Sequence, residues 1–210
     1  MKTLKGILLE GFLRKNIGLG KDALIRKWLD EYKITNYTIN DDLTIDVDGD
    51  VDLDFYKYEK LPEYIQFGAV RNYFSLYCSS NLTSLKGCPC EVGGDFYCSG
   101  CINLESLEEA PQKVGGSFEC RACNKLKSLE GAPQEVGWSF NCSGCSNLKS
   151  LKGCPKEVGI NFYCSECKNL TSLKGCPKEI GGDFYCKYHN KRFTTNDIKK
   201  VCKVKGEIRI

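Results

Sequence analysis

The sequence lacks several features that mark common functional classes. Its 210 residues include a single methionine and a single histidine. Glu10 interrupts the apolar run of Ile7, Leu8 and Leu9, which is too short for a secretory signal. No apolar stretch approaches the length of a membrane span. No nucleophile is paired with a base, and no glycine-rich phosphate loop opens a helix. We therefore expect a cytoplasmic protein that has no enzymatic activity, no cofactor and no contact with a membrane.

Excess charge of one sign is also missing. Lysine and arginine outnumber the acidic residues by three, which gives a formal net charge of +3. A balance of this size does not argue for a nucleic-acid partner. Hydrophobic residues make up 41% and charged residues 27%, as in an ordinary globular protein.

Cysteine, by contrast, is abundant. The chain has fifteen cysteines, an odd number. Because cytosolic thiols are kept reduced, we do not expect disulfides. The cysteines must then be core residues, metal ligands or redox groups.

A phenylalanine recurs every 22 residues, and this repeat predicts the fold. It occurs at Phe74, Phe96, Phe118, Phe140, Phe162 and Phe184. Each unit follows F-x-C-x-x-C-x-x-L-x-x-L-x-G-x-P-x-x-V-G-G, with some departures, and a degenerate unit covers residues 51–72. The pattern is similar to a leucine-rich repeat, in which the first apolar positions face inward on a short strand.

One unit shows what each position is expected to do. Phe96 and Cys98 face inward on the strand, and Cys101 turns back into the coil. Two leucines then cover the interior, a proline fixes the return path, and two glycines turn into the next strand. These last positions are Leu104, Leu107, Pro111, Gly115 and Gly116.

Because one such coil cannot bury its own apolar side, the coils must stack. We expect a β-rich, leucine-rich-repeat-like solenoid of about seven coils with short parallel strands, over residues 51–190. An N-terminal cap over 19–50 contains an amphipathic helix from Lys21 to Tyr32. A C-terminal cap over 191–210 contains a short helix, N-capped within Thr195 to Asp197, and a closing strand. We expect residues 1–18 to form a tail or a docking peptide.

The coils, the entry YTINDDLTIDVDGDVDL and the exit KKVCKVKGEI resemble leucine-rich-repeat-like proteins of tailed bacteriophages and gut bacteria. The similarity covers roughly residues 20 to 210. It implies a binding scaffold, located in the host cytoplasm if phage-encoded, with no catalytic residue to carry over. The chain departs from the leucine-rich template by one extra residue between Cys101 and Leu104, and by Phe or Cys where Leu is usual.

Four C-x-x-C pairs occur in register and allow two interpretations. They are Cys98/Cys101, Cys120/Cys123, Cys142/Cys145 and Cys164/Cys167. Such a pair is half of a zinc site, or a redox motif when it opens a thioredoxin-like helix, which is absent here. Alternatively, each cysteine is a small buried hydrophobe.

Replacements within the repeat favour packing. The first cysteine position holds Leu76 in the upstream coil, and the second holds Ser79 there and His189 in the last coil. A third set exchanges cysteine with alanine, at Cys88, Ala110, Ala132, Cys154 and Cys176. We therefore predict no metal. If that prediction is wrong, the expected ligands are Cys164, Cys167, Cys186 and His189.

The acidic run TIDVDGDVDLDF does not fit a calcium loop. Placing Gly49 at the glycine position of an EF-hand puts Thr44 first and Phe55 twelfth, where acidic ligands are required. Alternation of inward apolar residues with outward aspartates accounts for every position.

The outward positions of the strands form the expected binding face. We predict that a protein partner binds a concave strand face, because tyrosine and arginine often anchor interfaces. The candidate residues are Tyr77, Tyr97, Glu119, Arg121, Asn141, Tyr163, Tyr185 and Lys187, with Trp138. Trp138 replaces a turn glycine, and it either contacts the partner or covers its neighbour.

Overall fold

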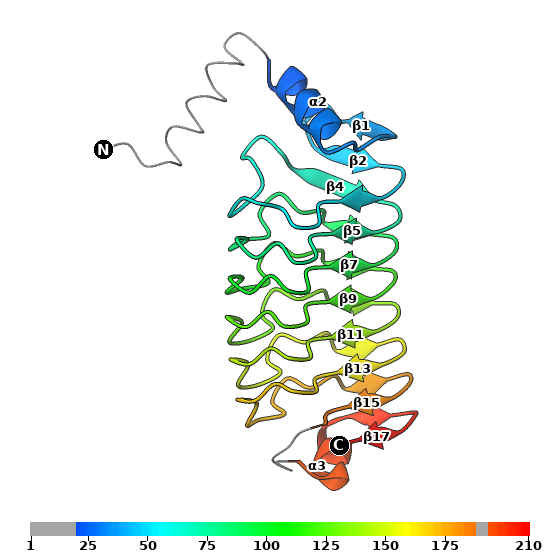
Figure 1. Ribbon diagram of the computed structural model, residues 1–210. Helices are drawn as coiled ribbons and strands as arrows, with labels where there is room; N and C mark the ends of the chain where they lie inside the picture. The colour runs from blue at the N-terminus through cyan, green and yellow to red at the C-terminus, as the bar shows by residue number, and fades with distance from the viewer. Residues whose placement is uncertain (1–19, 188–192) are drawn as a thin grey trace, which may run out of the picture.

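The computed structural model describes residues 20–187 and 193–210, which form a two-sheet parallel β-solenoid of about seven coils (Figure 1). Each coil contributes one short strand to each sheet, and Figure 1 shows the coils stacked in a nearly straight column. The expected solenoid with short parallel strands is confirmed. No helix among the described residues is both long enough and apolar enough to cross a membrane.

We call the two sheets sheet A and sheet B. Sheet B contains the repeated phenylalanines. Its eight strands are all parallel, each paired with the corresponding strand of the next coil. They are β3 (Val51–Asp52), β5 (Phe74–Ser75), β7 (Phe96–Tyr97), β9 (Phe118–Glu119), β11 (Phe140–Asn141), β13 (Phe162–Tyr163), β15 (Phe184–Tyr185) and β17 (Ile208–Arg209).

Sheet A contains the repeated valines, and the sequence analysis did not predict it as a sheet. We expected a proline to fix the return path and two glycines to form the turn on this side of the coil, and we assigned no strand to the valine between them. They instead pair along the stack as β4 (Phe67–Val70), β6 (Glu91–Val92), β8 (Lys113–Val114), β10 (Glu135–Val136), β12 (Glu157–Val158), β14 (Glu179–Ile180) and β16 (Lys203–Val204). At the N-terminal end, β2 (Ile45–Val47) pairs with β4, and β1 (Tyr37–Ile39) adds antiparallel to β2.

The interior is built from rows of identical side chains. The phenylalanine rings from Phe74 to Phe162 stack with centroids 5.3–5.7 Å apart and nearly parallel planes. The two cysteines and two leucines of each full coil are buried, as the repeat pattern predicts. Each coil therefore buries its apolar side against its neighbours rather than against itself.

The third residue after the sheet B strand is left-handed in six successive coils. Its φ lies between 54° and 78° at Phe55, Cys78, Gly100, Ala122, Gly144 and Glu166. A side chain in this conformation costs roughly 1–2 kcal/mol relative to glycine. The coil geometry, and not the local residue, therefore fixes the backbone here.

At the corner between the two sheets, a residue of one coil restricts which residue fits in the next coil. Asp95 Oδ1 accepts the N–H of Ser117 in the next coil at 2.6 Å. A Cβ at Gly116 would lie 2.3 Å from that oxygen, so the corner after an aspartate requires glycine. Gly182 follows Asn161 in the same way, while Trp138 follows the smaller Ser117.

Helices lie at both ends of the column (Figure 1). Helix α2 (Lys21–Glu31) buries Ile25, Trp28 and Leu29, and its Trp28 ring lies 6.2 Å from Phe67. Helix α3 (Thr195–Val201) is N-capped by Thr194, one residue before the expected cap, because the Thr194 side chain accepts the Asp197 N–H. The proposed tail or docking peptide lies outside the described residues.

Candidate functional site

The paired cysteines point into the solenoid and take part in a regular hydrogen-bond series. The second cysteine of each pair donates its S–H to the carbonyl oxygen at the first-cysteine position of the preceding coil. Cys123, Cys145 and Cys167 reach the Cys98, Cys120 and Cys142 oxygens at 3.1 Å. Ser79 makes the equivalent O–H bond to the Leu53 oxygen at 3.3 Å. The second position is therefore occupied by a small donor. The first is a packing position that Leu76 fills in the upstream coil, although Cys142 at this position also donates its S–H to the Tyr163 oxygen at 3.4 Å.

Contacts between thiols and burial make the first-position thiols poor nucleophiles. The pKa of Cys98 is raised well above its usual value by its contact with the Cys123 thiol and by desolvation. The pKa of Cys164 is raised by desolvation first and by Cys186 second. A thiol that resists ionisation is unsuited to redox attack or to metal binding as a thiolate.

The alternative metal set is only partly described. Cys164, Cys167 and Cys186 are buried, and His189 lies outside the described residues. Within residues 20–187 and 193–210, no three His, Cys, Asp or Glu side chains are grouped so that they could hold a metal ion.

The acidic run alternates as expected. Ile45, Val47, Val51 and Leu53 are buried while the aspartates between them reach the surface. Asp46 accepts the Ala69 N–H at 2.8 Å, and Asp54 accepts the Tyr77 N–H at 2.9 Å. These aspartates thus satisfy backbone groups of the following coil.

The outward side chains of sheet B make three parallel rows, which we call together the sheet B face. The leading row is Asp95, Ser117, Ser139, Asn161, Asp183 and Glu207. The central row is Tyr97, Glu119, Asn141, Tyr163, Tyr185 and Arg209. The trailing row is Tyr77, Ser99, Arg121, Ser143, Ser165 and Lys187. Strand pairing sets the register of the central row, and the other two rows lie two residues before and after it.

The structure brings together eight of the nine predicted binding residues. Five of them occupy the central row, and Tyr77, Arg121 and Lys187 occupy the trailing row. Trp138 lies apart, at the corner before Ser139, and is 57% exposed. Beside it in the next coil is Ile160, also exposed, whose N–H is bonded to the Trp138 oxygen at 2.7 Å.

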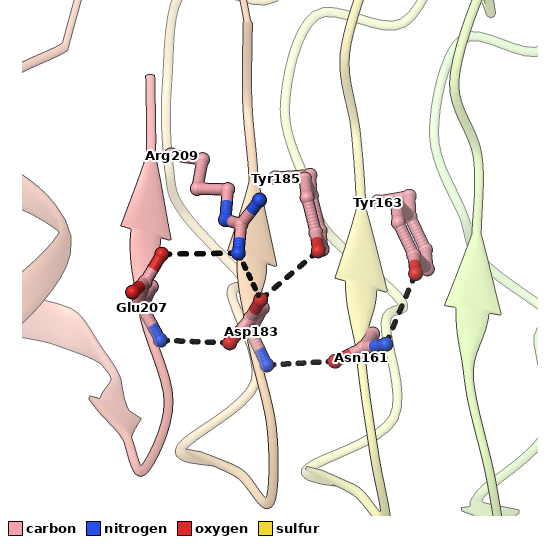
Figure 2. A network of polar contacts seen from close by, with 6 residues as sticks. All are labelled: Asn161, Tyr163, Asp183, Tyr185, Glu207 and Arg209. Carbon is pink, nitrogen blue, oxygen red and sulfur yellow. Dashed lines mark hydrogen bonds and ion pairs between the residues drawn. The ribbon is translucent and has the colours of Figure 1, made fainter.

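The C-terminal end of the face carries a continuous polar network (Figure 2). The Tyr185 hydroxyl donates to Asp183 at 2.9 Å, and the Asn161 amide donates to the Tyr163 hydroxyl at 3.0 Å. The rings of Tyr163 and Tyr185 stack with centroids 4.5 Å apart. Each hydroxyl is therefore held by the residue two places before it on the same strand.

Arg209 completes this network. Its guanidinium lies 5.2 Å from the centre of the Tyr185 ring and pairs with Asp183 at 3.3 Å and Glu207 at 3.0 Å (Figure 2). The pKa of Asp183 is lowered, first by the backbone N–H of Glu207, then by the Tyr185 hydroxyl, with Arg209 adding to the effect. Asp183 is thus stabilised as a carboxylate.

Sequence reasoning missed Glu207 and Arg209. The closing strand was predicted, but β17 pairs Ile208 with Phe184, an offset of 24 residues instead of 22. The signal was present in the order acidic–apolar–polar, which G-E-I-R shares with G-D-F-Y of the preceding coil.

The outer face of sheet A differs in its charge arrangement. At its two ends, cations pair with anions of the neighbouring coil: Lys113 with Glu91 at 3.4 Å, and Lys205 with Glu179 at 2.7 Å. These pairs lie beside a depression of about 520 Å³ that is floored by glycines of the corner. Because eight of the nine predicted binding residues lie on sheet B, we place the candidate site there.

Comparison of the chain with protein-family models, curated proteins and solved structures found no match. The geometry of the sheet B face is therefore the basis for any functional assignment.

Proposed function

We propose that this chain is a non-enzymatic interaction scaffold that binds a protein partner through the sheet B face. The supporting observation is the order of that face: aromatic, acidic and basic side chains lie in register on a stack of parallel strands. Tyrosines supply large contact area at low entropic cost, and interfaces are enriched in them. Because their hydroxyls are already bonded to Asp95, Asn161 and Asp183, little freedom remains to be lost on binding.

The resemblance to solenoid proteins of tailed bacteriophages and gut bacteria suggests the setting. We propose that the partner is a host or phage protein met in the host cytoplasm.

The test is affinity capture of the partner from a host or infected-cell lysate. Tyr97, Tyr163 and Tyr185 would be changed together to Asn, because Asn141 occupies the same row and shows that asparagine fits it. The matched control is Glu135→Gln with Glu157→Gln on the outer face of sheet A. We expect the tyrosine variant to lose the captured protein and the control to keep it. Equal capture by both variants would show that the sheet B face is not the binding surface.

The alternative function is metal binding or thiol redox chemistry by the C-x-x-C pairs. Elemental analysis of purified protein tests it directly. Zinc or iron at one or more equivalents per chain, removed by a chelator with loss of thermal stability, would replace the scaffold proposal. We expect neither the metal nor the loss.

A further inference from the structure

The repeat allows one site of the sheet B face to be understood from another. Tyr185, Asp183 and Arg209 form a unit in which a tyrosine ring and a carboxylate hold a guanidinium supplied by the next coil (Figure 2). The carboxylate accepts two further bonds, from the Tyr185 hydroxyl and from the Glu207 N–H. This unit shows how the face holds an arginine side chain.

The same tyrosine and carboxylate recur 88 residues earlier, four 22-residue units before Tyr185. The Tyr97 hydroxyl donates to Asp95 at 2.7 Å, and Asp95 also accepts the Ser117 N–H at 2.6 Å. These are the two contacts that Asp183 makes with Tyr185 and Glu207. Asp95 and Tyr97 are therefore arranged like the pair that holds Arg209.

The next coil differs at the decisive position. Tyr185 pairs in register with Arg209, whereas Tyr97 pairs with Glu119. Where the C-terminal unit has a cation of its own, this unit has a second carboxylate. Among the described residues, neither Asp95 nor Glu119 takes part in an ion pair.

The surroundings of Glu119 favour an incoming positive charge. Glu119 is half-buried, and its pKa is raised by desolvation first and further by the nearby Asp95 carboxylate, while Arg121 opposes the rise. A cation placed between the two carboxylates would stabilise both in their charged form, which offsets the desolvation of Glu119 and its repulsion by Asp95.

We infer that Tyr97, Asp95 and Glu119 form a binding site for an arginine side chain of the partner protein, a site we call the arginine site. This inference rests on the proposed function and specifies what the partner presents. A guanidinium is planar, stacks on an aromatic ring and donates to two carboxylates at once, which an ammonium does not do equally well. The negative charge of the site opposes binding of nucleic acid.

The test is an NMR titration of the full chain with three capped peptides. The probes are acetyl-Gly-Arg-Gly-amide, the same peptide with lysine, and the same peptide with citrulline, which keeps the shape of arginine but not its charge. We expect saturable shifts of the Tyr97 and Glu119 amide signals with the arginine peptide. We expect weaker binding of the lysine peptide and no binding of the citrulline peptide.

Two variants keep the test interpretable. Asp95→Asn preserves the local bonds, because Asn161 makes the same two kinds of contact, with the Tyr163 hydroxyl and the Asp183 N–H. Glu119→Gln removes the second charge. Each is expected to weaken arginine binding by about tenfold, while Glu135→Gln on sheet A has no effect. Shifts spread evenly over the surface carboxylates, or unchanged affinity in both variants, would overturn the inference.

The two proposals fail in different ways. If partner capture depends on the three tyrosines but is unaffected by Asp95→Asn and Glu119→Gln, the arginine site is wrong and the scaffold proposal stands. If capture is indifferent to the tyrosines, the scaffold proposal fails, and the peptide titration still decides whether the arginine site exists.

Discussion

At the scale of single residues, the two cysteines of each pair have different physical roles. Cys123 donates its S–H to the Cys98 carbonyl oxygen of the preceding coil, and the Ser79 hydroxyl makes the equivalent bond to the Leu53 oxygen. Cys120 occupies the packing position, which is leucine in the upstream coil at Leu76. The pair thus combines one polar and one apolar requirement.

This difference predicts that serine is tolerated at one position and not at the other. Cys123→Ser keeps a donor for the Cys98 oxygen and should lower the free energy of unfolding by less than about 1 kcal/mol. Cys120→Ser buries a hydroxyl at an apolar position and should lower the free energy of unfolding by about 1–3 kcal/mol. Urea unfolding followed by circular dichroism measures both. Equal costs would contradict the distinction between the two positions.

The left-handed residue three places after each sheet B strand gives a second test on single residues. Ala122 has a φ of 54° and Gly144 has a φ of 75° at the equivalent place in the next coil. A Cβ at Gly144 would meet nothing closer than 3.6 Å, so steric contact does not confuse the comparison. The two sites therefore report the backbone strain of the folded chain together with the entropy of the unfolded chain, without a steric contribution.

We expect Ala122→Gly to raise the free energy of unfolding by about 1 kcal/mol and Gly144→Ala to lower it by a similar amount. Thermal and urea unfolding of the two variants provide the measurement. A loss of stability in Ala122→Gly would mean that the entropy of the unfolded chain outweighs the strain.

At the scale of elements, the corner between the sheets couples residues of neighbouring coils. The bond from Asp95 to the Ser117 N–H occupies the space that a side chain at Gly116 would need. Serine at Ser117 leaves room for Trp138 one coil later. The choice of residue at one corner is thus set by the coil before it.

A double-mutant cycle tests this coupling. Gly116→Ala alone should cost about 1–3 kcal/mol through overpacking, and Asp95→Ser should reduce that cost by roughly 1 kcal/mol. The relief is partial because a Cβ there would also lie 2.8 Å from the Gly94 carbonyl carbon. Strictly additive costs, measured by urea unfolding, would show that the carboxylate does not restrict the corner.

The elements also show how far the sequence could be interpreted. A 22-residue period with inward Phe, Cys and Leu was enough to predict the coils, the buried cysteines and the outward tyrosines. Sheet A was missed because two-residue strands such as Glu91–Val92 are too short to show alternation, and a valine before two glycines is typical of a turn. Arg209 was missed because the 24-residue offset of the last coil hid its place in the central row.

At the scale of the whole molecule, the buried thiols should make stability depend on alkaline pH. Burial raises the pKa of Cys88. The pKa values of Cys120 and Cys142 are also raised, first by their contacts with the Cys145 and Cys167 thiols and then by desolvation. The unfolded chain begins to release its thiol protons near pH 8.5, while the folded chain keeps them. The free energy of unfolding is therefore fully maintained below that pH and falls as the pH rises above it.

Cys88→Ala isolates one contribution, because Ala110 and Ala132 occupy the same row and show that alanine fits. Each thiol should add about 1.4 kcal/mol per pH unit to the slope above its unfolded pKa. We expect the slope of unfolding free energy between pH 9 and 10 to be smaller in Cys88→Ala than in the wild-type chain. The comparison removes the contribution of buried tyrosines such as Tyr56, whose pKa is also raised. Identical slopes would show that Cys88 ionises equally in both states.

Because each coil adds one strand to sheet B, the side chains of the sheet B face are separated by whole multiples of the spacing between strands. Tyr97 and Tyr163 stand three strands apart, and neighbouring strands are separated by about 4.8 Å. Insertion or deletion of one 22-residue unit between them would lengthen or shorten that spacing by one strand and leave both ends intact. Duplication or loss of one unit during evolution would thus change the distance between the two tyrosines, and so the partner that fits them, while the residues around each tyrosine stay the same.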